Sequence, residues 1–348
     1  MDQNLTDIEK LKTQVEKSSL PEELKNRAYS MVDRVTLSLK FGANITAIDT
    51  VTRYINWITS LPWNTRTADV LDLKLVSQEL NKTHHGLTEI KERILEYIAV
   101  LKLMKTKGKT SYLRAPILCF VGLAGTGKTT VAQAIAEAMK RKFVRIPLGG
   151  MGSSLELRGQ SQVLANSEPG QIIKVLKRVQ TKNPVILLDE IDRVAESARG
   201  DIMGVLLELL DPEQNYAYVD NYIDYPFDLS EVLFITTANN TTSISTAVLD
   251  RLDTLQMPSY SDEEKITIAK DYMLGKVMKE TGLDEINLTV DPLVWPQIVR
   301  PLGFDSGIRS LERTIQGICR KVAKKIINGE GTNFHITTQN VREFLPSW

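Results

Sequence analysis

The sequence has little of several features that would decide its class at once. Only two of its 348 residues are cysteines, Cys119 and Cys319, so a disulfide framework is excluded and a reducing cytoplasm is the expected location. Its 43 basic residues are matched by 43 acidic residues, and this balance lacks the positive surplus of a dedicated nucleic-acid binder. No apolar run approaches the roughly 20 residues that span a bilayer, and no basic region followed by an apolar core opens the chain. We therefore expect a globular protein without a membrane partner.

The chain is long enough for two or three domains, and its patterning divides it into three parts. Residues 1–75 form a helical N-terminal segment, in which Leu24, Ala28 and Met31 recur at helical spacing after a candidate cap at Ser19. A second helix is predicted over 45–59. Residues 76–258 are predicted to form a large α/β nucleotide-binding domain, and residues 259–348 a smaller helical domain.

The large domain is predicted from short apolar strands that alternate with helical stretches. Most of these strands are continuously apolar, which is typical of a parallel sheet covered by helices on both faces. The predicted strands are 117–121, 143–147, 185–188, 232–236 and 254–257. Helices predicted in the small domain are 263–274, 292–299 and 307–327. The expected fold class is therefore α/β, a parallel sheet flanked by helices with a helical small domain and a helical N-terminal segment.

A glycine-rich motif follows the first predicted strand and precedes a helical run that starts at Thr130, and the motif and Thr130 are expected to bind the nucleotide. It matches the pattern G-x-x-x-x-G-K-[ST] with Gly122, Leu123, Ala124, Gly125, Thr126, Gly127, Lys128 and Thr129. Glycines let backbone N–H groups surround phosphates, and the helix N-terminus favours anions. Lys128 is expected to neutralise the β- and γ-phosphates of ATP or ADP, and Thr129 to bind Mg²⁺. The alternative is a glycine-rich turn without a chemical role.

Two carboxylates, Asp189 and Glu190, end the apolar strand predicted at 185–188. Strand ends are where ligands of open α/β sheets bind. Asp189 is therefore expected to hold Mg²⁺, and Glu190 to orient and polarise the attacking water. Alone, this pattern is also typical of a solvated strand end, and the upstream phosphate loop is what favours the catalytic interpretation.

Two further polar residues follow the strand predicted at 232–236. Asn239 is a candidate sensor that hydrogen-bonds the γ-phosphate or the lytic water, although asparagine also commonly ends strands. Arg251 is a candidate arginine finger that reaches the nucleotide of a neighbouring subunit. A surface ion pair of Arg251 with Asp250 or Asp253 is the competing interpretation.

Arg309 lies in the first turn of the helix predicted at 307–327. Because the helix dipole disfavours cations there, an arginine at this place indicates an anionic partner. That partner is either the γ-phosphate or, more trivially, Glu312.

Beyond these motifs, long stretches of the sequence resemble the ATPase part of the Lon family of ATP-dependent proteases. The resemblance covers roughly residues 20–345. The matching stretches are 54–57, 61–64, 85–87, 91–97, 116–119, 148–150, 187–192, 199–201, 206–215 and 307–313.

The resemblance implies an AAA+ motor that hydrolyses Mg-ATP, assembles as a homo-oligomeric ring of six subunits and pulls protein substrates through a central pore. It also implies the roles given above for the phosphate loop, the two carboxylates, the sensors and the finger. In addition, His85, Gly86 and Leu87 are implied to form part of the adenine pocket, with His85 where the family usually has tyrosine.

The sequence departs from the family in its substrate-contacting loops. Leu164 stands at the position of the aromatic residue of the first pore loop, and leucine offers less contact area and no π-face. The second loop, 195–198, also lacks a bulky residue. The resemblance ends near residue 345, and the sequence offers no candidate for the serine-lysine peptidase domain that the family carries.

Three functions stay open on these residues. The chain is the ATPase module of a Lon-type protease whose peptidase domain or partner lies outside this sequence, or it is a complete, non-proteolytic AAA+ protein-remodelling ATPase. A nucleic-acid motor is the third, disfavoured by the balanced charge.

Overall fold

A computed structural model describes residues 2–40, 46–107, 117–164, 166–300 and 307–346. The chain divides into two compact units, which are treated separately below. The first unit contains Met1–Leu71, Val100–Cys119 and Met139–Asp253, and the second contains Asp72–Ala99, Phe120–Ala138 and Thr254–Trp348. Among the described helices, none combines the length and the apolar character needed to cross a membrane.

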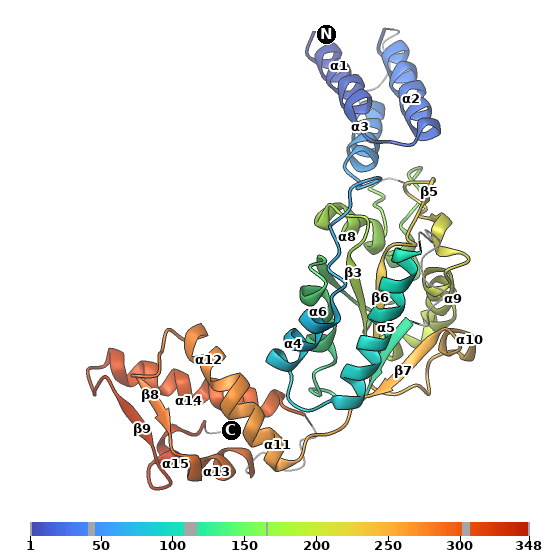
Figure 1. Cartoon of the computed structure of the whole chain (residues 1–348). Coiled ribbons are helices and arrows are strands. Elements are labelled where there is room, and N and C mark those ends of the chain that lie inside the picture. The colour runs from blue at the N-terminus through green and yellow to red at the C-terminus, as the bar shows by residue number, and fades with distance from the viewer. Residues whose placement is uncertain (1, 41–45, 108–116, 165, 301–306, 347–348) are drawn as a thin grey trace. The chain divides into compact units, whose positions relative to one another are not determined.

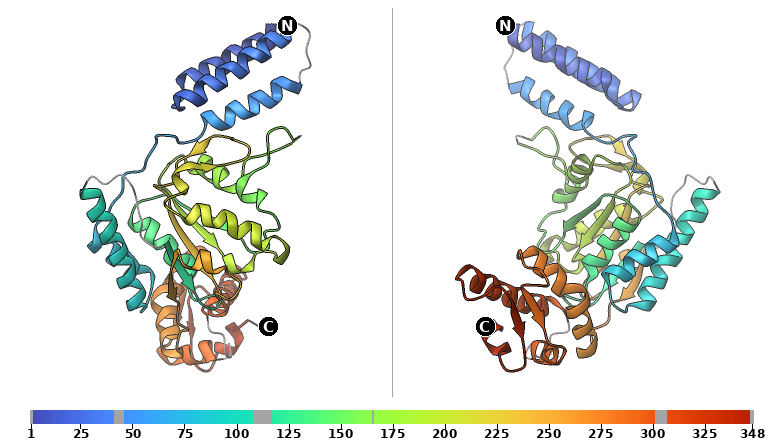
Figure 2. Two further views of the ribbon diagram at one scale, coloured as in Figure 1. Left: turned by 90° about the vertical axis from the view of Figure 1, so that its right-hand side faces the viewer. Right: turned by 60° about the vertical axis from the view of Figure 1, so that its left-hand side comes forward.

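The first unit begins with three helices that pack against one another, drawn in blue in Figures 1 and 2. They are α1 (Asp2–Lys17), α2 (Glu22–Lys40) and α3 (Thr46–Thr59), as the helical periodicity predicted. Residue 45, where the second helix was expected to start, lies outside the described residues. The start of α2 differs from the prediction, because the first helical hydrogen bond runs from Lys25 N–H to the Pro21 carbonyl. Pro21 thus occupies the cap position, and Ser19 lies outside the helix.

An extended segment, residues 64–71, continues from these helices along the α/β part of the first unit. It is fixed by Asp69, whose carboxylate accepts two hydrogen bonds from Arg141, at 2.8 and 2.9 Å, and one from Asn183 at 2.9 Å. The side chains of Asp69 and Arg141 are only 11% and 7% exposed, so this ion pair is shielded from solvent screening. This shielded ion pair, together with hydrogen bonds from the N–H groups of Thr67 and Val70, holds the segment.

The central sheet has five strands in the order β2-β3-β6-β1-β7. β2 pairs with β3 and β3 with β6, both parallel, with Pro147 beside Asp189 and Leu188 beside Thr236. β3 and β6 are buried along their whole length because helices cover both faces. The strand bounds are Ile117–Val121 (β1), Phe143–Pro147 (β2), Val185–Asp189 (β3), Leu233–Ala238 (β6) and Leu252–Gln256 (β7). The helices of this part are α7 (Leu155–Arg158), α8 (Gln171–Val179), α9 (Arg199–Leu210) and α10 (Thr246–Leu249).

A short antiparallel hairpin in the first unit escaped the sequence analysis. Its strands are β4 (Tyr218–Val219) and β5 (Pro226–Phe227), each of two residues. Strands this short carry no measurable alternation, so periodicity does not reveal them. The hairpin receives the Tyr54 hydroxyl of α3, which donates to the Ile223 carbonyl at 2.9 Å. It thus ties the N-terminal helices to the α/β part.

The second unit contains α4 (Leu73–Thr83), the first part of α5 (Thr88–Thr106), α6 (Lys128–Ala138) and the small domain. The small domain is mostly helical, as expected, and it also includes a short parallel pair of strands that was not predicted. The helix expected at 263–274 continues through a π-helical stretch, Ile268–Met273, to Glu280. The remaining elements are α11 (Asp262–Thr267), α12 (Leu274–Glu280), β8 (Leu288–Val290), α13 (Trp295–Val299), α14 (Arg309–Ile327), β9 (Phe334–Ile336) and α15 (Val341–Phe344).

The shielded ion pair predicts a large cost when one partner is removed. Arg141→Met should lower the free energy of unfolding by about 3–5 kcal/mol, because Asp69 then keeps its buried charge without a cation. The double variant Arg141→Met, Asp69→Leu should recover most of that loss. Urea unfolding followed by tryptophan fluorescence measures both. A single variant as stable as the unaltered chain would show that the pair contributes nothing.

Candidate functional site

The phosphate loop of the second unit connects β1 to α6 and has a backbone that its glycines make possible. Gly125 and Gly127 have φ angles of 82° and 95°, in the region that side chains disfavour. A Cβ atom at Gly122 would lie 2.7 Å from the Met257 carbonyl oxygen. The spacing of the motif is thus explained by backbone conformation at two glycines and by close packing at the third.

Lys128, the first residue of α6, brings a positive charge into this loop. Its side chain is only 8% exposed, and Nζ donates to the carbonyl oxygens of Gly122, at 2.5 Å, and Leu123, at 2.9 Å. Thr129 is the next residue, in the first turn of α6. A buried ammonium group beside a helix N-terminus gives a field that favours an anion such as a phosphate.

His84 supports the phosphate loop, a role that the sequence analysis did not predict. Its two ring nitrogens lie 2.8 Å from Thr83 Oγ1 and 2.9 Å from Thr130 Oγ1. Thr130 Oγ1 in turn donates to the Gly127 carbonyl oxygen at 2.8 Å. Burial, with a smaller effect of Lys91, lowers the pKa of His84 to about 4, so the ring is neutral at pH 7. A neutral imidazole therefore links α4 to the first turn of α6.

The turn between α4 and α5 contains the adenine-pocket candidates, His85, Gly86 and Leu87. Gly86 and Leu87 have φ angles of 61° and 54°, so two successive residues are left-handed and the chain reverses sharply. The His85 ring lies 6.2 Å from the Tyr272 ring, edge to face. Each of these rings has a π-face of the kind on which a base can stack. Tyr272 was not predicted as a site residue, because it lies in the π-helical stretch, far from His85 in the sequence.

The small domain contacts the phosphate loop through the start of α14. The Ile308 N–H donates to the Gly125 carbonyl oxygen at 3.0 Å. A Cβ atom at Gly125 would lie 3.3 Å from Cγ of Arg309, so the stem of Arg309 passes over the loop. Among the residues that the structure describes, Arg309 forms no ion pair with Glu312, the trivial partner considered above. The guanidinium group is exposed and stays available to an anion.

In the first unit, Asp189 is held by both neighbouring strands. Its side chain is buried, Oδ2 accepts a hydrogen bond from Arg145 Nε of β2 at 2.6 Å, and Oδ1 accepts one from the Thr237 hydroxyl of β6. Thr237 Oγ1 also accepts the Glu190 N–H, at 2.9 Å. One hydroxyl group thus positions both carboxylate residues, and neither Thr237 nor Arg145 was predicted as a site residue.

Glu190 has an unusual backbone that places its side chain beside β2. Its φ and ψ angles are 58° and 50°, which is left-handed and uncommon for a glutamate. A Cβ atom at Gly149 would lie 2.7 Å from Glu190 Oε2, so the Glu190 side chain lies against this glycine and would shift if Gly149 were larger. Such an outlier is maintained only where the surroundings require it, and it is typical of functional positions.

Asn239 follows β6 directly and lies at the same sheet edge as Asp189. The register places Leu188 beside Thr236, and Asn239 is three residues beyond that point. Its neighbour Asn240 donates from its backbone N–H to Asp192 Oδ2 at 3.3 Å. The position of Asn239 suits a sensor, and that role stays a prediction.

Arg251 forms an ion pair that the sequence analysis did not consider. Its Nη2 atom lies 3.1 Å from Asp211 Oδ2, and Nη1 donates to the Ala247 carbonyl oxygen. Burial opposes ionisation of Asp211, but hydrogen bonds from the Glu213 N–H and from Arg251 outweigh it and lower the pKa of the carboxyl group. The arginine side chain is 36% exposed, so part of the guanidinium group faces solvent.

Comparisons with known proteins agree with this geometry. Residues 118–260 match the model of the ATPase family associated with various cellular activities, and residues 279–334 match that of the Lon protease AAA+ ATPase lid domain. A Lon protease of Syntrophomonas wolfei is 39% identical over 344 residues, and one of Desulforamulus reducens is 42% identical over 331. Lon protease 1 of Bacillus subtilis is 40% identical over 339 residues.

The matches cover 95–99% of this chain but 40–43% of the three relatives. The chain thus spans about two fifths of the length of the curated relatives that it matches. The sheet, the phosphate loop, the strand-end carboxylates and the family match define an AAA+ ATPase. Within that class, the lid domain and the relatives show that the chain belongs to the Lon family.

Substitutions at two adjacent threonines of β6 test whether Thr237 positions Asp189 and Glu190. Thr237→Val should lower the free energy of unfolding by about 1–3 kcal/mol and slow ATP turnover, because Asp189 and the Glu190 N–H lose a shared partner. Thr236 is equally buried, and its hydroxyl has no hydrogen-bond partner in the described part of the chain. Thr236→Val should therefore be neutral or stabilising. Urea unfolding and phosphate release measure both variants, and equal effects would refute the assigned role of Thr237.

The neutral His84 predicts a pH dependence of stability. The unfolded chain takes up a proton near pH 6.5 and the folded chain only near pH 4, so stability should fall as pH decreases through that window. The contribution of one such group is at most about 1.4 kcal/mol per pH unit. His84→Gln should flatten the dependence of the urea midpoint between pH 6.5 and pH 4.5, whereas His335→Gln removes an exposed imidazole as a control. An unchanged slope in His84→Gln would contradict the burial of a neutral ring.

Proposed function

We propose that the chain is the ATPase module of a Lon-type ATP-dependent protease, and that it hydrolyses Mg-ATP to unfold and move protein substrates. The observation that carries the proposal is the pairing of a glycine-rich loop after β1 with two strand-end acids held by one threonine at the end of β3. The sheet order β3-β6-β1 supports their action on one nucleotide, because ligands of open α/β sheets bind at the carboxyl ends of adjacent strands.

In this proposal the phosphate loop binds the nucleotide and Lys128 neutralises the β- and γ-phosphates. The loop backbone and the start of α6 supply N–H groups to the same anion. His85, Gly86 and Leu87 border the adenine, supported by the His85–Tyr272 ring pair. In this assignment the phosphates of the nucleotide are recognised by charge, and the adenine is recognised by stacking.

Magnesium would be held by Thr129 and Asp189, and it would supply neutralisation of charge on the transferred phosphoryl group. The residues fit such an ion, because hydroxyl and carboxylate oxygens are the ligands that Mg²⁺ prefers. Asp189 is suited to this role since its carboxylate is held on both sides, by Arg145 and by Thr237.

Glu190 accepts a proton from the attacking water, and its Oε1 atom lies 3.7 Å from Nη1 of Arg193. Asn239 contacts the γ-phosphate or this water. Arg309 contacts the γ-phosphate from the small domain and couples nucleotide state to that domain. Arg251 acts as a finger toward the nucleotide of a neighbouring subunit, and releases Asp211 when it does so.

A ring of six identical subunits in the cytoplasm is the proposed assembly, with a protein substrate in its pore. The names of the relatives support the protease context, and the fraction of their length that the chain spans leaves room for a peptidase domain outside this sequence. The second candidate is a non-proteolytic remodelling ATPase. It is favoured by the pore-loop position occupied by Leu164, where an aromatic gripping residue is expected.

Two substitutions separate binding from hydrolysis. Lys128→Ala should weaken nucleotide affinity at least tenfold, because the loop loses its buried cation. Glu190→Gln should keep ATP affinity but slow turnover by about 100-fold or more, since an amide does not accept the proton of water. Glu137→Gln on the exposed side of α6 is the matched control. Fluorescent-nucleotide binding and phosphate release measure the three variants, and normal turnover in Glu190→Gln would exclude it as the base.

A further inference from the structure

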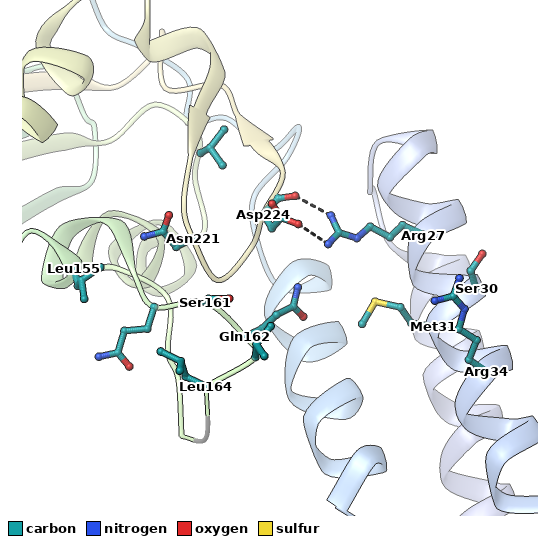
Figure 3. A pocket seen from close by; sticks show the side chains of 13 residues that line it. Arg27, Ser30, Met31, Arg34, Leu155, Ser161, Gln162, Leu164, Asn221 and Asp224 are labelled. Atoms are coloured by element: carbon teal, nitrogen blue, oxygen red, sulfur yellow. Dashed lines mark hydrogen bonds and ion pairs between the residues drawn. The ribbon is translucent and has the colours of Figure 1, made fainter.

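A groove of about 1060 Å³ lies inside the first unit, between α2 and the loop at residues 160–164. Figure 3 shows its two walls, with Met31 reaching from α2 toward the wall that carries Gln162 and Leu164. Apolar side chains of this region are strongly exposed, at 89% for Val163, 58% for Leu164 and 46% for Leu155. Ligand pockets for small molecules rarely exceed this volume, so the groove is large enough for a segment of polypeptide.

Both walls of the groove are fixed by the β4–β5 hairpin, so contacts within the fold determine its shape. On one side, Arg27 of α2 donates to the Asp224 carboxylate at 2.6 Å and to its carbonyl at 2.8 Å, as Figure 3 draws. On the other side, the buried Asp220 accepts the Gly170 N–H at 2.7 Å, and the Asn221 N–H donates to the Arg158 carbonyl. The hairpin thus anchors α2 and the base of the 160–168 loop to one support.

The charge of the groove is positive and comes from one residue. Arg27 is neutralised by Asp224, but Arg34 is exposed and forms no ion pair or hydrogen bond with any residue in the described ranges. No acidic residue other than Asp224 lines the groove. A ligand that carries a carboxylate is therefore favoured over one that carries an ammonium group.

The polar groups of the loop suit a peptide backbone. The side-chain amides of Gln160 and Gln162 line the groove, and within the described ranges they make no hydrogen bond. An amide offers both a donor and an acceptor, which matches the N–H and C=O groups of an extended chain. Apolar contact surface beside free amides is thus complementary to an extended polypeptide with apolar side chains.

We propose that this groove binds an extended segment of a protein substrate that combines apolar side chains with an acidic side chain, and that Arg34 pairs with the acid. The inference rests on the proposed function for its substrate class and adds a binding site and a sequence preference to it. The groove holds the substrate segment against Val163 and Leu164. The aliphatic side chains of this loop therefore contact a substrate that the groove has already bound. This second contact offsets the smaller area of leucine at that position.

The test uses two fluorescein-labelled peptides of about twelve residues, in which leucine alternates with serine and one central residue is glutamate or lysine. Fluorescence anisotropy with the full 348-residue chain measures their affinities. The glutamate peptide should bind about threefold to fivefold more tightly, as expected for a solvent-exposed ion pair, and high salt should remove the difference. Arg34→Gln should abolish the preference and Arg34→Glu should reverse it.

The controls separate the groove from a general effect of charge or apolar surface. Arg342→Gln removes another exposed arginine and should leave the preference unchanged. Val163→Ser should weaken both peptides to a similar extent, whereas Ile327→Ser, at a residue equally exposed in the small domain, should weaken neither. All these side chains are exposed, so the variants should fold.

Equal affinity of the unaltered chain for the two peptides, or an Arg34→Gln variant that keeps the preference, would overturn the inference. Loss of self-association in Val163→Ser, seen by sedimentation, would also overturn it by showing that a second copy of the chain occupies the groove. Phosphate release is measured on the same samples. ATP turnover without peptide preference would refute the groove alone, and peptide preference without turnover would refute the proposed function alone.

Discussion

One hydroxyl group organises the catalytic end of the sheet. Thr237 Oγ1 donates to Asp189 and accepts the Glu190 N–H, so the two acids are positioned by a single atom on the neighbouring strand. Arg145 contacts Asp189 from the opposite strand. Without the hydroxyl group, the Asp189 carboxylate would depend on its contact with Arg145, and the Glu190 N–H would lose its acceptor. The depth of the site in the sheet, with β3 and β6 fully buried, prevents water from replacing these contacts.

The phosphate loop is supported in a comparable way by groups outside its motif. His84 contacts Thr130, and the Tyr260 hydroxyl donates to the Thr126 carbonyl oxygen at 3.1 Å. The Ile308 N–H contacts the Gly125 carbonyl from the small domain. A ligand that moves any of these loop carbonyls thus acts directly on α4 or on the start of α14. In the proposed function, these contacts would transmit nucleotide binding to the small domain.

The sequence was a good guide where the determining interactions are local. Continuous apolar runs predicted β1, β3 and β6, because burial on both faces leaves mostly apolar residues there. β2 and β7 combine buried with exposed residues, and β7 begins two residues before the predicted 254–257. The glycine motif predicted the loop, because backbone conformation at Gly125 and Gly127 excludes most side chains. The match to the AAA and Lon lid models confirms the class that these motifs indicated.

The supporting residues escaped prediction because their partners are distant in the chain. Arg145 and Thr237 lie 44 and 48 residues from Asp189, and His84 lies 46 residues from Thr130. An arginine on a strand or a buried threonine has many possible partners until the strand order is known. Arg251 illustrates the same limit, since Asp211, 40 residues away, is its partner and only the adjacent acids were considered.

The central claim is that the phosphate loop and the two strand-end acids hydrolyse one bound ATP, and that this hydrolysis drives the unfolding and movement of polypeptides. Phosphate release from Mg-ATP by the unaltered chain, at concentrations at which it is oligomeric and with an unfolded polypeptide present, tests it most directly. The account predicts sustained turnover that requires magnesium and rises when the polypeptide is added. Purified, folded and oligomeric protein that releases no phosphate under these conditions would contradict it.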